Sequence, residues 1–126
     1  MQKHFTHLKT RLKYDDLLVE NATTGRTYLT PTGSRYPSIT TVLGILSEDS
    51  IREWRNRVGA EEANRISRKA STRGTNLHLV AEKYINNDPE YMKGQMPHVI
   101  ELFKSIQPIL DERINNIRAQ EIALYS

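Results

Sequence analysis

The chain has no cysteine among its 126 residues. This excludes disulfide bonds and cysteine-ligated zinc, and it fits a reducing compartment. No apolar run approaches the roughly 20 residues that a membrane-spanning helix needs. The N-terminal residues Met1–Phe5 also lack the apolar core of a secretory signal. We therefore expect a soluble, cytoplasmic protein that is not secreted.

Charge of one sign is not in large excess, because 18 Lys and Arg residues stand against 15 Asp and Glu residues, a net charge of +3. Basic residues nevertheless gather between Arg52 and Arg73, where seven of them stand against three acidic residues. Such a local excess is typical of a surface that contacts phosphates. A solvated helix face shows the same pattern, and charge alone does not separate the two interpretations.

The length of the chain predicts one domain. Residues 1–13 are polar and basic and predict a flexible lead-in, and residues 14–126 predict a single domain of the α+β class, dominated by helices. Strand-forming residues at Leu17–Glu20 and Arg26–Thr30 flank turn-forming residues and predict an N-terminal hairpin. The alternation of polar and apolar residues in Glu121–Tyr125 predicts a C-terminal strand.

Two short helices are predicted after the hairpin. Ser38 can cap the first, which runs to Ile45 or Leu46. Asp49 or Ser50 can cap the second, which Gly59 breaks or bends.

A long amphipathic helix is predicted over residues 60–86, because apolar residues recur there at steps of three and four. Gly74 lies on the apolar face, where a mid-helix glycine costs about 1 kcal/mol relative to alanine. Close approach of another group should offset that cost. A last helix is predicted to begin at Pro97, with Pro108 kinking or dividing it. The apolar stripe of the long helix contains Ala63, Ile66, Ala70, Gly74, Leu77, Ala81 and Tyr84.

A basic face runs along the same long helix, where Arg65, Arg68, Lys69 and Thr72 recur at helical spacing. Arginine can bind phosphate through two hydrogen bonds, and threonine adds a donor. Hydroxyls at a helix start can bind an anion or simply cap the helix. The predicted DNA contacts are Ser38, Thr40, Thr41, Arg52, Arg55, Arg65, Arg68, Lys69, Arg73 and Thr75.

His78 and Glu82 lie four residues apart, so their side chains should project from one helix face. Imidazole nitrogen and carboxylate oxygen can together bind a divalent metal. Two ligands are too few for tight binding, and most such pairs are ordinary surface residues. The other three histidines have no comparable context and are interpreted as surface residues.

Four separated motifs occur in a set order: Pro37–Leu43, Trp54–Gly59, Arg73–Glu82 and Glu121–Ser126. Over residues 36–126 this series resembles the PD-(D/E)XK nuclease superfamily, and it is most similar to RecB-like phage exonucleases and the mitochondrial genome maintenance exonuclease. The resemblance implies helices packed around a mixed sheet. It also implies a Mg²⁺ or Mn²⁺ cofactor that activates water to hydrolyse DNA phosphodiester bonds.

The resemblance also implies residue roles: His78 as a metal ligand, Glu121 as a metal ligand and catalytic residue, and Glu82 as a further catalytic carboxylate. The family continues with an Asp and an Asp-x-Lys motif that do not follow Glu121 here. We therefore expect the N-terminal part of a metal-dependent DNA exonuclease from a phage or bacterial host cell, unable to cut DNA alone.

Two other functions stay open. The chain can be a stand-alone helical module that binds nucleic acid without catalysis. It can also be an interaction protein, in which the edge of the terminal strand pairs with a second copy or with a C-terminal partner.

Overall fold

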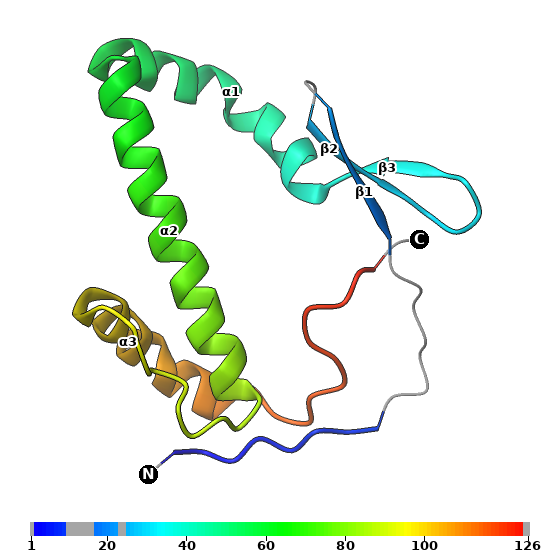
Figure 1. The fold of residues 1–126 in the computed structure, drawn as a ribbon, viewed down its shortest axis with the longest axis vertical. Coiled ribbons are helices and arrows are strands. Elements are labelled where there is room, and N and C mark those ends of the chain that lie inside the picture. Colours follow the sequence, from blue (N-terminus) through cyan, green and yellow to red (C-terminus); the bar gives the residue numbers. More distant parts are fainter. Residues whose placement is uncertain (1, 10–16, 23–24, 125–126) are drawn as a thin grey trace. The chain divides into compact units, whose positions relative to one another are not determined.

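The computed structural model describes residues 2–9, 17–22 and 25–124. Within these ranges three strands come first and three helices follow (Figure 1), which confirms the predicted α+β, helix-dominated class. The chain divides into two compact units, and the prediction of a single domain over residues 14–126 stays a prediction. The first consists of Met1–Arg11 with Arg65–Glu121, and the second of Leu12–Asn64 with Ile122–Ser126.

The first two strands form the predicted hairpin. β1 (Leu18–Ala22) pairs antiparallel with β2 (Gly25–Leu29), and Leu18 lies opposite Leu29. A third strand, β3 (Arg35–Pro37), was not predicted and pairs with the other side of β2. Residues 23 and 24 of the predicted turn lie outside the described residues.

The next element, α1 (Ile39–Val58), is one helix of 20 residues, so the prediction of two short helices is wrong. Ser38 caps it as expected, because its hydroxyl accepts a hydrogen bond of 3.1 Å from a backbone N–H in the first turn. Asp49 lies inside the helix instead of capping a second one, and its carboxylate pairs with Arg52 at 3.3 Å. Such pairs offset the small cost of an interior aspartate, and the helix continues to Gly59.

The long helix α2 (Ala60–Ile85) ends one residue before the predicted boundary. Asn87 stops it in the left-handed conformation, with a φ of 64°. The N–H groups of Asn87 and Asp88 then donate to the carbonyls of Tyr84 and Lys83, each at 3.0 Å. This pair of bonds satisfies two carbonyls of the last turn, and it ends the helix sharply.

The last helix, α3 (Pro97–Arg113), begins at the predicted proline. Pro108 lies inside it, yet the helix is not divided as predicted. Pro108 is exposed, so the Lys104 carbonyl that loses its hydrogen-bond partner stays accessible to water. The cost of the proline is therefore small enough for the helix to continue.

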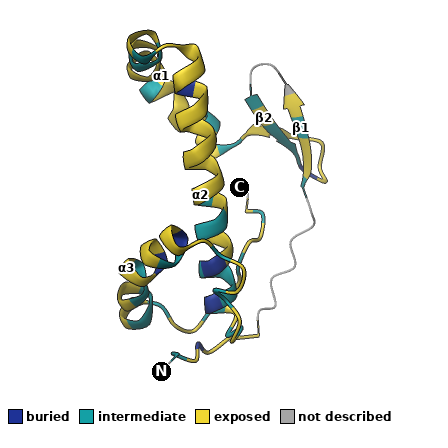
Figure 2. Ribbon diagram, turned by 60° about the vertical axis from the view of Figure 1, so that its left-hand side comes forward, coloured by how far each residue is buried: buried dark blue, intermediate teal, exposed yellow. Residues whose placement is uncertain are grey.

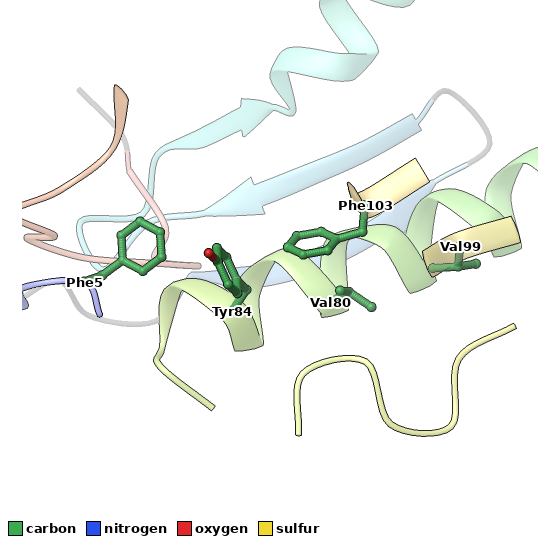
Figure 3. Packing of buried hydrophobic residues seen from close by; sticks show 5 residues of the cluster. All are labelled: Phe5, Val80, Tyr84, Val99 and Phe103. Carbon is green, nitrogen blue, oxygen red and sulfur yellow. The ribbon is translucent and has the colours of Figure 1, made fainter. Parts of the chain in front are cut away.

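The core of the first unit lies between the last turns of α2 and the facing side of α3. Phe5, Val80, Tyr84, Val99 and Phe103 are each no more than 1% exposed (Figure 3). The rings of Phe5 and Phe103 meet Tyr84 edge-on, with centroids 5.3 and 5.1 Å away. Edge-on pairs at these distances add to the stabilisation from burial alone.

The predicted apolar stripe of α2 is buried at Ala63 and is covered again toward its C-terminal end. Leu77 and Ala81 pack against the core, whereas Ile66 is 38% exposed and the first half of the helix is largely open (Figure 2). No neighbouring element among the described residues approaches Gly74, because a Cβ there would meet nothing within 4 Å outside its own helix backbone, and close approach by a substrate stays a prediction. Val80 lies beside the stripe and is buried because α3 packs against it.

The N-terminal segment is anchored in its described part, so a flexible lead-in over residues 1–13 is wrong for residues 2–9. Phe5 is buried, and its backbone N–H and C=O both bond to the side-chain amide of Asn87, at 2.7 and 2.9 Å. His7 also forms a parallel bridge with Ile117. A single aromatic residue in a polar segment does not predict this, because its burial depends on the site that α2 and α3 provide.

The strand predicted at Glu121–Tyr125 is not formed in its described part. Glu121 has a φ of 52°, outside the strand region, and residues 122–124 pair with no other described segment. A segment in which polar and apolar residues alternate forms a strand only where a neighbouring segment supplies backbone hydrogen bonds. Association through the edge of this segment stays a prediction.

Replacing Phe5 by alanine is expected to lower the free energy of unfolding by about 3–5 kcal/mol, because it empties an aromatic site in the core. Urea unfolding measures this change. The exposed neighbour His4 supplies the control, since His4→Ala should alter stability by less than about 0.5 kcal/mol. Equal stability of the two variants would contradict the packing of the N-terminal segment.

A second prediction concerns Tyr84, whose hydroxyl donates to a carboxylate oxygen of Asp111 at 2.5 Å. Burial, and then this hydrogen bond, raise the pKa of Tyr84 above its ordinary value. Because the folded-state pKa is the higher one, the contribution to stability is complete below roughly pH 10 and is lost as the pH rises further.

Tyr84→Phe is therefore expected to cost about 1–2 kcal/mol at neutral pH and to reduce the decline of stability above roughly pH 10. Urea unfolding at neutral and alkaline pH tests both effects. Tyr36→Phe, at an exposed position, is the control and should follow the parent protein. An equal decline of stability at alkaline pH in Tyr84→Phe and in the parent protein would contradict the attribution of this decline to Tyr84.

Candidate nucleic-acid interface

An open groove of about 520 Å³ lies between α2 and the start of α3. Five of its lining side chains come from one face of α2: Arg68, Lys69, Thr72, Arg73 and Asn76. The opposite wall is formed by Met96 and His98 at the beginning of α3. All of these residues belong to the first compact unit.

Helix geometry explains why the α2 residues line the groove together. Positions 68, 72 and 76 are four residues apart, and positions 69 and 73 form the adjacent row on the helix surface. The core face begins next to these rows, where Val80 packs in the same cluster as Val99. Since Val99 follows His98 directly, this core packing holds the first turn of α3 against the basic face.

The groove is strongly positive. Arg68, Lys69 and Arg73 bring three cations to it, and no acidic side chain lines it. Within the described ranges none of the three makes a salt bridge. The first turn of α3 also carries no acidic residue, so the partial positive charge of that helix end is not neutralised.

The predicted basic face is therefore partly assembled into one site. Arg68, Lys69 and Arg73 come together, with Thr72 between them. Arg65 lies one turn earlier on α2 and does not line the groove. Thr75 is exposed and does not line the groove.

Three groove residues were missed as binding residues from the sequence. Asn76 continues the row of Arg68 and Thr72 at a spacing of four, so helical periodicity was a sufficient signal for it. Met96 and His98 had no such signal, and His98 was interpreted as an ordinary surface residue. Only the packing of α3 on α2 brings them to the groove.

The other predicted DNA contacts lie in the second unit and are engaged there. Arg52 pairs with Glu48 at 3.3 Å, and Arg55 donates to the side chain of Asn64 at 2.7 Å. The hydroxyl of Ser38 serves as the helix cap and also contacts the hydroxyls of Thr40 and Thr41, at 3.1 and 2.8 Å. This geometry is that of an ordinary helix cap, which was the alternative interpretation of these hydroxyls. Their role in DNA binding stays a prediction.

The predicted metal and catalytic residues lie away from the groove. His78 follows Asn76 by two residues, about 200° around the helix, and neither His78 nor Glu82 lines the groove. The side-chain amide of Gln120 donates to the backbone carbonyl of Glu82 at 3.3 Å. This bond brings the segment that carries Glu121 beside the last turns of α2.

These residues do not make a complete metal site. In the part of the chain that the structure describes, no three His, Cys, Asp or Glu side chains are grouped so as to hold an ion. Mg²⁺ requires about six ligands in octahedral geometry, mostly oxygens. The described residues supply at most part of this ligand set, and the roles of His78, Glu82 and Glu121 stay predictions.

Comparison with known protein families, curated proteins and solved structures finds nothing that matches this chain. The nuclease resemblance thus rests on the four motifs alone. Among the described helices, none combines the length and the apolar character needed to cross a bilayer.

Gly74→Ala provides a test of the α2 surface around the predicted metal ligands. It is expected to raise the free energy of unfolding by about 0.5–1 kcal/mol, because alanine favours the helix and its Cβ would meet no neighbour. DNA affinity should not change, since Gly74 lies away from the groove. A loss of stability in urea unfolding would show that another group packs at this position.

Proposed function

We propose that this chain binds the phosphate backbone of DNA through the groove between α2 and α3. One observation carries the proposal: Arg68, Lys69 and Arg73 line a single groove in which no acidic side chain opposes them. Three unpaired cations held close together repel one another, and an anionic ligand relieves that repulsion.

The other groove residues suit the same ligand. Each guanidinium can form two parallel hydrogen bonds with a phosphate, and the ammonium of Lys69 acts as a compact charge. Thr72 and Asn76 add neutral donors on the same face. Three phosphate contacts should release counterions and produce a logarithmic salt slope of roughly −2 to −3.

Arg68→Ala combined with Arg73→Ala is expected to weaken DNA binding on the order of tenfold or more at low salt, and to reduce the salt slope by roughly 2. Fluorescence anisotropy with a labelled oligonucleotide over a series of salt concentrations measures both quantities. Circular dichroism should show unchanged folding, because both side chains are exposed.

The matched double variant is Arg52→Ala with Arg55→Ala on α1. It removes the same charge from side chains that already pair within the second unit, so affinity should fall less than about threefold. An equal loss in both double variants would mean that overall charge, and not the groove, binds DNA.

A second candidate is the metal-dependent DNA exonuclease that the motif resemblance implies, acting in the cytoplasm of a phage host or bacterium in repair or recombination. The hydrogen bond from the Gln120 side chain to the Glu82 carbonyl favours the exonuclease, because this bond brings Glu121 near the helix that carries His78. His78, Glu82 and Glu121 would supply part of a Mg²⁺ or Mn²⁺ site, and further oxygen ligands would have to complete it. We expect no DNA cleavage by this chain alone.

Isothermal calorimetry with Mn²⁺ tests the second candidate. The exonuclease proposal expects weak Mn²⁺ binding that disappears in His78→Ala and in Glu121→Gln, while DNA affinity is retained. His4→Ala serves as the control for loss of an exposed imidazole. Mn²⁺ binding that is indifferent to both site variants would contradict this candidate and leave the binding function unaffected.

A further inference from the structure

The groove is lined by two side chains that phosphate binding does not require. Its α3 wall is formed by a thioether, Met96, and an imidazole, His98. Met96 is 59% exposed, it makes no side-chain cap for α3, and it is not part of the core cluster. Its side chain is therefore available at the groove without a role in holding the fold.

These wall residues suit a flat, apolar ligand surface. Imidazole rings stack on unpaired bases, and a methionine sulfur makes favourable contacts with aromatic rings. The opposite side carries arginine guanidinium planes, which also stack on bases. A volume of about 520 Å³ is in the range of sites that enclose ligands of drug-like size, and a nucleotide is such a ligand.

We infer that the groove holds an unpaired nucleotide, with its base against Met96 and His98 and its phosphates on Arg68, Lys69 and Arg73. Asn76, on the α2 side, can donate to and accept from the edge of the base. This inference rests on the proposed DNA binding and makes it specific: the substrate is a single strand. In a duplex the base faces are stacked and closed to such contacts.

Pro97 stands between the two wall residues as the first residue of α3. Its ring fixes the backbone φ near −65°, which limits the freedom of the wall before a ligand binds. The side chains of Met96 and His98 thus extend from a helix start that the core contact of Val99 already holds in place. Little backbone ordering is needed when the base enters.

The test compares three ligands by fluorescence anisotropy: an oligothymidylate, the same strand in a duplex, and a strand of equal length and charge with abasic sites. The parent protein is expected to bind the oligothymidylate on the order of tenfold more tightly than the other two. A uridine strand of the same length reports whether DNA or RNA supplies the nucleotide. Tighter binding of either strand than of the duplex supports the proposal.

Met96→Ala and His98→Ala are expected to weaken oligothymidylate binding on the order of fivefold to tenfold while leaving the salt slope unchanged. Met96→Leu keeps an apolar wall and should bind within about twofold of the parent protein. His4→Ala removes an exposed imidazole that does not line the groove and should have no effect. Thermal unfolding confirms that each variant is folded.

Equal affinity for the oligothymidylate, the duplex and the abasic strand would overturn the inference, as would unchanged binding in Met96→Ala and His98→Ala. Either result leaves the proposed phosphate contacts intact, provided that Arg68→Ala with Arg73→Ala still weakens binding. Absence of binding to every oligonucleotide at low salt would instead reject the proposed function, and the inference with it.

Discussion

The side chain of Tyr84 connects separate segments of the first compact unit. Its ring packs edge-on against Phe5 from the N-terminal segment, and against Tyr91 and Phe103 from the loop and helix that follow. Its hydroxyl donates to Asp111 near the end of α3. Because these contacts hold α3 against α2, they also decide where the first turn of α3 lies. The α3 wall of the candidate binding groove therefore depends on packing that involves none of the groove residues.

Three sides of α2 have different surroundings, and their separation decides what the chain can do. One side carries Tyr84 and forms the core, the next carries the three cations of the groove, and a third carries His78 and Glu82. A residue two positions farther along a helix lies on nearly the opposite side, so residues adjacent in sequence belong to different surfaces. The resemblance based on the four motifs assigns these residues to a single nuclease signature. In this structure the residues that line the basic groove and the predicted metal ligands are different sets.

The sequence predicted those elements that depend on local chemistry. The hairpin, the Ser38 cap, the end of α2 near Asn87 and the start of α3 at Pro97 all follow from residues next to one another in the chain. Two of the errors arose where a distant segment decided the outcome. Phe5 was assigned to a flexible lead-in, although it enters a site that α2 and α3 create. The alternation after Gln120 predicted a strand, but the described residues offer it no partner.

Helical spacing in the sequence by itself determined that Arg68, Lys69, Thr72 and Arg73 share one side of a helix, because that grouping depends only on the 3.6-residue repeat. It also determined that His78 and Glu82 project from one helix face. Only the tertiary structure decided that Met96 and His98 complete a groove with the basic residues. Their placement depends on Val80 and Val99 packing in one core cluster, and such a contact between segments far apart in the chain has no periodic signal. The physical reason is the sequence separation over which each effect operates. Helical backbone geometry relates residues a few positions apart, whereas the hydrophobic effect favours contact between apolar side chains at any separation in the chain.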